Sequence, residues 1–389
     1  MASRIILCLN SGSSSLKFAL YRIGDREEIL LAQGAAELND GQISRLWIQS
    51  PHKKIEKTGN EISSHSTLLN ALSIELKQLG LPHPDAVGHR LVHGGPHHAA
   101  PEQITEKLLR ELRSLIPFAP LHLPEEIAGI EAIISNFGNL PQVACFDTAF
   151  HRSMPEVAQR FALPRALLDE GIRRYGFHGI SYEYIMQILG AAPPSRLIIA
   201  HLGNGASMAA VKDGNPLDTT MGFTPAGGFM MGTRSGDLDP GIILYLLNEK
   251  HFSANQIADL VNNQSGLVGL SGISDMKMLL ERRATSSDAA MAVQMFCYQL
   301  RKQIGAFAAA LGGLDLLVFT GGIGEKAAPV RWETCGGLQH LGIKLERERN
   351  DANADLISTD DSECVVRVIP TNEDLMIARH TYNLVFSST

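Results

Sequence analysis

Two arginines of the sequence have the surroundings expected of residues that bind phosphate or carboxylate groups. Arg90 and Arg234 each lie beside glycines, in segments that are otherwise apolar. A guanidinium group can donate two parallel hydrogen bonds to a carboxylate or a phosphate. Either arginine could instead form a structural salt bridge, and the sequence leaves both interpretations open.

An aspartate and a histidine are candidates for the chemistry itself. Asp147 directly follows the apolar run 142–146, and ligands of α/β sheets collect at the carboxyl ends of strands. It is therefore a candidate metal ligand or base, although it could equally cap a helix. His178 is flanked by Gly176 and Gly179, so a ligand could approach its ring closely. A buried histidine with satisfied hydrogen bonds is the alternative.

Three turns rich in glycine and small polar residues follow apolar runs. They are Asn10–Ser15, Gly203–Ser207 and Gly321–Glu325. Backbone N–H groups and hydroxyls in such turns form cradles for anions, and a cation such as Lys17 strengthens them. Each turn alone could be ordinary, but the three together favour a bound nucleotide or polyphosphate. The first is no P-loop, because Lys17 lies in a strand and does not open a helix.

The elements that must position these residues predict an α/β fold. The apolar run 5–9 indicates a buried strand, and residues 16–21 alternate as a second strand does. Asn39-Asp40-Gly41 predicts a hairpin turn. Further strands are expected at 29–33, 42–49, 86–92, 142–146, 196–201, 208–212, 314–320 and 364–369, and helices at 67–79, 105–114, 124–135, 240–247, 288–311 and 373–384.

A weak internal repeat suggests two related lobes that face one nucleotide. The segments LNSGSSSLKF and LGNGASMAAV both read as a strand, a polar turn and a second strand. The length of 389 residues also favours two domains. We expect an N-terminal lobe of residues 1–150 completed by the C-terminal helix 373–389. A second lobe of residues 151–372 would bind the nucleotide and form the dimer contact.

Composition limits the classes of partner. Apolar residues make up 44% and charged residues 19% of the chain, as in a globular enzyme, and the net charge is −7. This balance gives no support for nucleic-acid or membrane binding. The five cysteines are scattered without a C-x-x-C pair, which predicts reduced thiols in a cytoplasmic protein. We expect neither a signal peptide nor a membrane span.

Eight motifs together carry a resemblance to a known family. In chain order they are LCLNSGSSSLKF, GHRLVHGG, FDTAFH, RRYGFHG, AHLGNGAS, MMGTRSGDLDP, FTGGIGE and PTNEDLMIA. This series resembles the acetate kinases, and more broadly the short-chain carboxylate kinases. The resemblance implies the acetate and sugar kinase/Hsp70/actin fold, a duplicated ribonuclease H-like fold with ATP in a cleft between two lobes. It also implies a homodimer and reversible transfer of the ATP γ-phosphoryl group to acetate with Mg²⁺ or Mn²⁺.

The resemblance also implies a role for each matching residue. Asn10 and Glu373 match the metal site, although Glu373 could simply favour a helix N-terminus. Catalytic roles fall to Arg90, Asp147, His178 and Arg234, and the acyl pocket to Arg90, Val92, Leu121, Phe177 and Pro225. Nucleotide contacts fall to Ser13, Ser15, Lys17, His201, Leu202, Gly203, Asn204, Gly205, Asp275, Met276, Lys277, Gly322, Ile323, Gly324, Glu325 and Lys326.

Some positions depart from the family pattern, and other functions stay open. The departures are Ser11 for Ala, Leu123 for Asn, Ile180 for Thr, Tyr182 for His and Lys326 for Asn. They put in question the rate, the preferred acid and the phosphoryl donor. A propionate or butyrate kinase is the main alternative, and a non-catalytic sensor of the same fold is the second. The retained charged residues argue against a sensor.

Overall fold

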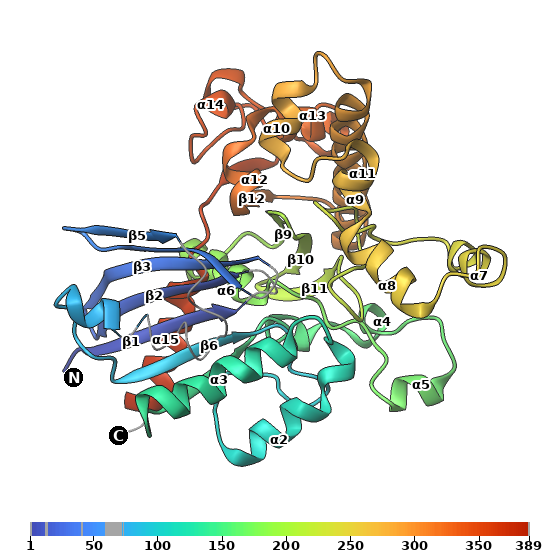
Figure 1. Cartoon of the computed structure of the whole chain (residues 1–389). Coiled ribbons are helices and arrows are strands. Elements are labelled where there is room, and N and C mark those ends of the chain that lie inside the picture. Colours follow the sequence, from blue (N-terminus) through green and yellow to red (C-terminus); the bar gives the residue numbers. More distant parts are fainter. Residues whose placement is uncertain (1, 12–14, 40–41, 59–71, 73, 388–389) are drawn as a thin grey trace. The chain divides into compact units, whose positions relative to one another are not determined.

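The computed structural model describes residues 2–11, 15–39, 42–58, 72 and 74–387. The chain divides into two compact units, each built on its own mixed sheet (Figure 1). Unit 1 comprises Met1–Phe150 and Asn372–Thr389, and unit 2 comprises His151–Thr371. Each unit combines its sheet with helices, so the predicted α/β class is confirmed.

Unit 1 contains an eight-stranded sheet in the order β5-β4-β3-β2-β1-β6-β8-β7. The hairpin strands from β1 to β5 pair antiparallel, whereas β1, β6 and β8 run parallel to one another. Their carboxyl ends therefore lie at one edge of the sheet. The strands are β1 (Arg4–Ser11), β2 (Ser15–Gly24), β3 (Glu27–Asn39), β4 (Gln42–Gln49), β5 (Lys54–Thr58), β6 (Ala86–Leu91), β7 (Glu102–Gln103) and β8 (Gln142–Phe146).

One face of the unit 1 sheet carries the alternation predicted for β2. Leu16, Phe18 and Leu20 are at most 2% exposed and join a core cluster with residues of α3 (Leu123–Phe137). The prediction of a period-two strand is therefore confirmed. The alternation leaves Lys17 on the other face of the strand, with its side chain exposed.

The opposite face of the same sheet packs against α15 (Glu373–Phe386), which contacts β1, β2 and β6. The helix begins after its N-cap Asn372, whose side-chain oxygen also accepts a hydrogen bond from the Tyr21 hydroxyl at 3.2 Å. At Gly88 of β6, a Cβ would lie 2.3 Å from Thr381 Oγ1, so glycine permits the close approach. These contacts fix the start of α15 against the sheet.

Unit 2 contains a five-stranded sheet in the order β11-β10-β9-β12-β13. The neighbours β11, β10 and β9 pair antiparallel, whereas β9, β12 and β13 run parallel. The parallel pairs bring the turns after β9 and β12 to the same edge. The strands are β9 (Arg196–Leu202), β10 (Ala206–Lys212), β11 (Asn215–Thr219), β12 (Leu316–Thr320) and β13 (Val365–Val368).

The longest helix, α11 (Ser287–Leu311), packs against the unit 2 sheet and confirms the prediction for 288–311. Ser286 caps its start, and Gly312 ends it with a φ of 78° in the left-handed region. The helices that bear on the site are α6 (Gly179–Leu189), α10 (Met276–Arg282) and α12 (Gly321–Lys326), and further helices of unit 2 include α7 (Pro240–Asn248) and α13 (Ala328–Cys335).

Some sequence predictions lie outside the described residues. These are the turn at 40–41, the middle of the first glycine turn at 12–14, and residues 67–71 and 73 of the predicted helix 67–79. All five cysteines are described, each is buried, and none forms a disulfide. Among the described helices, none is both long enough and apolar enough to cross a bilayer.

Candidate active site

Three polar side chains meet at the carboxyl edge of the parallel strands of unit 1. The register of β1 and β6 places Asn10 opposite Arg90, and Asp147 directly follows β8. Arg90 Nη1 donates to Asn10 Oδ1 at 3.0 Å, and Arg90 Nε donates to Asp147 Oδ2 at 3.0 Å. Arg90 Nη2 also donates to Asp147 Oδ2. Arg90 thus forms a salt bridge that lies at the strand ends where ligands collect.

This ion pair is largely buried. The side chain of Asp147 is 1% exposed and that of Arg90 is 18% exposed. Burial acts to lower the pKa of Arg90, but the negative charges of Asp147 and Glu373 outweigh it and raise the pKa above its ordinary value. Arg90 therefore stays a cation throughout the working pH range. Asp147 is the carboxylate that pairs with this cation.

The sequence prediction missed Glu126, a buried carboxylate on α3 beside this pair. It is 2% exposed, and both of its oxygens accept a hydrogen bond from Val92 N–H at 3.1 Å. Burial raises the pKa of Glu126 to about 8, against the opposing effects of Arg90 and the Val92 bond. Helical spacing could have revealed it, because Glu126 follows Leu123 by three residues on the apolar face of α3.

The first turn of α15 adds negative charge to the same neighbourhood. Burial, with a contribution from the charge of Glu373, raises the pKa of Asp374 to about 6, whereas Lys17 and Arg90 oppose this rise. The predicted metal ligands Asn10 and Glu373 thus both lie in the surroundings of Arg90. Among the described residues, no three His, Cys, Asp or Glu side chains are grouped to hold a metal ion.

The first predicted phosphate turn is described only at its ends. Ser13 lies outside the described residues, and Ser15 opens β2. Lys17 is paired in register with Asn10 across the β1–β2 hairpin, and its side chain is exposed.

The corresponding turns of unit 2 are held by backbone hydrogen bonds. Gly203 N–H donates to Gly205 O at 3.0 Å, and Asn204 O accepts from the N–H of Gly232, also at 3.0 Å. After β12, Glu325 Oε1 accepts a hydrogen bond from Gly321 N–H at 3.0 Å. The same oxygen accepts a second hydrogen bond from Thr371 N–H at 3.2 Å. Gly321 has a φ of 76°, a left-handed conformation that requires glycine here.

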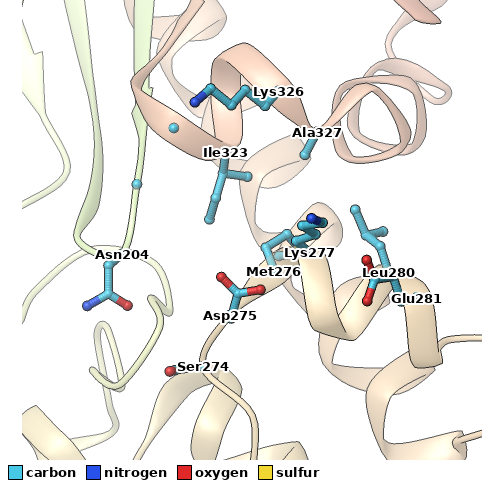
Figure 2. A pocket seen from close by; sticks show the side chains of 12 residues that line it. Asn204, Ser274, Asp275, Met276, Lys277, Leu280, Glu281, Ile323, Lys326 and Ala327 are labelled. Carbon is cyan, nitrogen blue, oxygen red and sulfur yellow. The ribbon is translucent and has the colours of Figure 1, made fainter. Parts of the chain in front are cut away.

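A pocket of about 950 Å³ opens beside these turns. Its volume lies at the upper end of the range for small-molecule sites, which suits a nucleotide. Figure 2 shows its side chains reaching in from the turn after β9, from α10 and from α12. The predicted nucleotide-contacting residues among its lining are Gly203, Asn204, Asp275, Met276, Lys277, Gly322, Ile323 and Lys326.

The pocket also has members that the sequence prediction missed. Ser274, Leu280, Glu281 and Ala327 line it as well. Leu280 and Glu281 lie four residues after Met276 and Lys277, so the helical period of α10 places them on the same side. That period would have found them if the sequence had revealed that 276–282 is a helix.

Besides the residues of the first turn, five predicted nucleotide residues of unit 2 are not part of this lining. Leu202 is fully buried, His201 is 9% exposed, and Gly324 is also buried. Glu325 holds the turn after β12 by its carboxylate, as described above. Gly205 lies close to the catalytic candidates His178 and Arg234.

His178 and Arg234 converge on the turn after β9. A Cβ at Gly205 would lie 3.4 Å from His178 Nε2 and 3.4 Å from Arg234 Nη1, so both nitrogens face the bare backbone of this glycine. The ring of His178 stacks on that of His201, with 4.3 Å between the centroids. Arg234 Nη1 donates to Pro225 O at 3.2 Å. The sequence marked both residues as candidates, and the structure brings them together.

The predicted acyl-pocket residues differ in exposure. In unit 1, Val92 is 3% exposed, whereas Leu121 is 47% exposed. In unit 2, Phe177 is 1% exposed, and its carbonyl accepts a hydrogen bond from the His151 ring at 3.1 Å. Pro225 is half-buried and is held through its carbonyl by Arg234.

Comparison with known proteins decides the family. A model of the Acetokinase family matches residues 5–379. The chain belongs to this family. An acetate kinase of Methylocella silvestris is 44% identical to it over 98% of both chains. An acetate kinase of Carboxydothermus hydrogenoformans is 43% identical over 98% of this chain and 99% of its own length.

Solved structures of the family share the fold. A propionate kinase from Francisella tularensis matches with a TM-score of 0.92 and 38% identity, covering 99% of this chain and 100% of its own. The acetate kinase of Porphyromonas gingivalis matches with a TM-score of 0.87 and 37% identity, over 98% of this chain and 100% of its own.

The positions that depart from the pattern of this family have distinct places. Lys326 lines the pocket, whereas Ser11, Leu123 and Ile180 are buried and at most 5% exposed. Tyr182 is fully buried, and its hydroxyl is hydrogen-bonded to Ser207 Oγ. Lys326 and Tyr182 are thus the two departures that reach groups of the candidate site.

Proposed function

We propose that this chain is an acetate kinase that transfers the γ-phosphoryl group of ATP to acetate, reversibly and by direct in-line transfer. Family membership over nearly the whole chain supports this reaction. The structural observation that carries the proposal is the convergence of His178 Nε2 and Arg234 Nη1 on Gly205. The same turn lines the pocket through Gly203 and Asn204. N–H donors at this place suit the charged oxygens of a transferring phosphoryl group.

Little base catalysis is needed, because a carboxylate acceptor is already ionised and nucleophilic at neutral pH. The protein has to position the acceptor and neutralise charge. We assign the acceptor carboxylate and the transferring group to Arg90 and Arg234. Asp147 orients Arg90, since it accepts hydrogen bonds from two of its nitrogens.

Magnesium or manganese fits the oxygen donors around Arg90. Asn10 offers an amide oxygen and Glu373 a carboxylate, and Mg²⁺ commonly takes one or two protein oxygens together with water and substrate phosphates. Burial, with a smaller contribution from the charge of Glu373, raises the pKa of the neighbouring Asp374. When bound, the ion would neutralise charge on the nucleotide phosphates. Lys17 adds a further cation on β2.

The pocket of unit 2 is our assignment for the nucleotide. Asp275 caps α10 by accepting from Met278 N–H at 2.8 Å, which fixes the segment that carries Met276 and Lys277. Residues of α12 form the other wall. We therefore assign ATP and ADP to this pocket, with the phosphates toward the turn after β9.

Propionate kinase is the second candidate function. One methylene group changes binding by only about 1–3 kcal/mol. Small differences among the apolar residues that contact the acyl group would therefore change the preferred acid. We assign contacts with the acyl group to Val92 and Leu121 in unit 1, and to Phe177 and Pro225 in unit 2. The Francisella tularensis relative is titled a propionate kinase, which keeps this alternative in the test below.

We also propose that two copies of the chain associate through α7. When burial by the described residues alone is counted, none of the nine residues of this helix is buried. Ile242, Leu244 and Tyr245 are 46%, 58% and 53% exposed, and an apolar surface of this kind favours a protein partner. Leu244→Glu should convert a dimer to monomers in light scattering. The buried cysteines without a disulfide agree with a cytoplasmic location.

Trapping of the acyl phosphate with hydroxylamine tests the proposed reaction. The purified chain is given Mg²⁺ and ATP with acetate, propionate, butyrate or glucose. Acetyl hydroxamate formed several-fold faster than propionyl hydroxamate is the expected result. A larger propionyl signal would favour the second candidate. Nucleotide binding without any hydroxamate would refute the kinase and favour a sensor.

A further inference from the structure

A chain of hydrogen bonds behind His178 has no role in the site described so far. His178 precedes α6 with a φ of 59°, and Tyr182 lies one helical turn later. Ser207 of β10 lies between the two side chains. His178 Nδ1 is 2.9 Å from Ser207 Oγ, and the Tyr182 hydroxyl is hydrogen-bonded to the same oxygen. Tyr182 and Ser207 are both fully buried.

The hydrogens of this chain have one favoured arrangement. A phenol is a stronger donor and a weaker acceptor than an aliphatic hydroxyl, so the Tyr182 O–H donates to Ser207 Oγ. The single hydroxyl hydrogen of Ser207 is then directed to His178 Nδ1, which acts as an acceptor. A neutral imidazole carries one hydrogen, and this arrangement leaves it on Nε2.

His178 Nε2 is the ring nitrogen that faces the turn after β9. It lies 3.4 Å from where a Cβ at Gly205 would stand, as does Arg234 Nη1. A hydrogen on Nε2 therefore lies beside the donors of Arg234, at the proposed phosphoryl position. The other tautomer would present a lone pair to the negative phosphoryl oxygens and would repel them.

A second chain holds the ring on which His178 stacks. His201 Nδ1 is 2.8 Å from Ser181 Oγ, and Ser181 Oγ donates to Thr371 Oγ1 at 2.9 Å. Both rings are thus fixed through Nδ1 by a serine. Two stacked imidazolium cations would repel each other, so the stacking disfavours a state in which both rings are charged.

We propose that Ser207 and Tyr182 are positioning residues that hold His178 as the tautomer with hydrogen on Nε2. The kinetic part of this inference rests on the proposed kinase activity, whereas the tautomer does not. Loss of either hydroxyl would release the ring to the other tautomer or to a rotated position. The cost would fall on turnover, because neither residue lines the nucleotide pocket.

Nitrogen NMR of the full chain labelled with ¹⁵N-histidine tests the tautomer. Signals of His178 are assigned by their loss in His178→Gln. We expect hydrogen on Nε2 in the wild type and a mixed or shifted pattern in Ser207→Ala and Tyr182→Phe. Hydrogen on Nδ1 in the wild type would overturn the proposal, as would an unchanged pattern in both variants.

Kinetics of the same variants separate positioning from packing. We expect kcat to fall about 10- to 100-fold in Ser207→Ala and less in Tyr182→Phe, with the KM values for ATP and acetate changed less than about threefold. Tyr175→Phe is the matched control, because it removes a buried tyrosine hydroxyl that donates to Gly171 O at 2.8 Å. It should keep wild-type kcat. An equal loss of kcat in Tyr175→Phe and Tyr182→Phe would show that the effect comes from packing and not from positioning of His178, and it would overturn the proposal.

The two parts of the test fail in different ways. A wild type that forms no acyl phosphate from any acid would refute the proposed function, and the NMR spectra would still report the tautomer. An active wild type with the hydrogen of His178 on Nδ1 would refute only the proposed positioning by Ser207 and Tyr182.

Discussion

The sheets of the two units share a five-strand core with the same topology. The order β3-β2-β1-β6-β8 in unit 1 corresponds to β11-β10-β9-β12-β13 in unit 2. In both cores the first three strands form antiparallel pairs, and the last three run parallel. The weak repeat between LNSGSSSLKF and LGNGASMAAV thus extends to the whole sheet. Such agreement is the structural mark of a duplicated fold.

The chemistry at the carboxyl ends of these two cores differs. Unit 1 places ionised side chains there, namely Arg90 and Asp147, with Asn10 beside them. Unit 2 places glycine turns there, together with a pocket of nucleotide size. The topology therefore determines where ligands gather, and the residue types determine which ligand each edge suits. We assign the acceptor and the metal to unit 1, and the nucleotide to unit 2.

Replacement of Arg90 should have the largest effect on this division. Arg90→Ala removes the cation of unit 1 and leaves Asp147 buried without it, so kcat/KM for acetate should fall about 10³-fold or more. Arg90→Lys keeps the charge but loses the paired N–H donors of the guanidinium group, so its kcat/KM for acetate should lie between those of the wild type and Arg90→Ala. Arg110→Ala, on the exposed face of α2 (Glu106–Ser114), is the control and should keep wild-type kinetics. Similar rates for Arg90→Ala and the control would remove Arg90 from the site.

Glu126 should make the stability of unit 1 depend on pH. The pKa of this buried carboxyl is raised from 4.5 to about 8, so the folded unit keeps a proton that the unfolded chain releases. This contribution to stability is complete below about pH 4.5, is lost as pH rises, and levels off above about pH 8. Glu126→Gln cannot ionise, so its stability relative to the wild type should rise by a few kcal/mol, roughly, from pH 5 to pH 8.5.

Urea unfolding measures this difference in a background with one tryptophan. Trp47 lies on β4 of unit 1 and Trp332 on α13 of unit 2, so Trp332→Phe leaves a fluorescence signal from unit 1 alone. Stability curves of the two proteins that stay parallel across this pH range would contradict the raised pKa of Glu126.

Gly205 tests the convergence of donors in unit 2. In Gly205→Ala the new Cβ would stand at van der Waals distance from His178 Nε2 and Arg234 Nη1, in the space proposed for a phosphoryl oxygen. We expect kcat to fall about 10- to 100-fold with little loss of stability. Gly305→Ala in α11 is the control, since its Cβ would meet no described atom within 4 Å and it does not line the nucleotide pocket. A loss of kcat as large in the control would show that the effect is not specific to the turn after β9.

Lys326 should have the smallest effect. Its ammonium group lines the nucleotide pocket, where a partly solvated charge contributes modestly. Lys326→Ala should weaken ATP binding by about two- to fivefold and leave the KM for acetate unchanged. Competition with GTP and pyrophosphate will show whether Lys326 also sets the choice of donor. A change in the KM for acetate without a change in ATP affinity would contradict the assignment of Lys326 to the nucleotide site.

The sequence predicted the elements whose patterns are local. The alternation of β2 and the spacing of α11 follow from residues close in the chain, and both are confirmed. The repeat indicated duplication because it lies in two short hairpins. The polar strands β5 and β11 escaped prediction, since neither has an apolar pattern long enough to identify it.

The site was less accessible to prediction, because it depends on pairings between distant segments. The register of β1 and β6 places Asn10 opposite Arg90, and local patterns do not determine such a register. The contact of Tyr182 with Ser207 likewise joins α6 to β10. Arg90 and Arg234 were marked by their glycine neighbours, but only the structure shows that Arg90 pairs with Asp147.

Binding of ADP to Arg90→Ala tests the division between the two units most directly. ADP lacks the γ-phosphate, so its affinity should depend on the pocket of unit 2 and little on the charges of unit 1. Calorimetric titration should give a Kd within about threefold of the wild type, although the variant has lost turnover. A Kd weakened more than about tenfold would contradict the account, because Arg90 would then contribute to nucleotide binding as well.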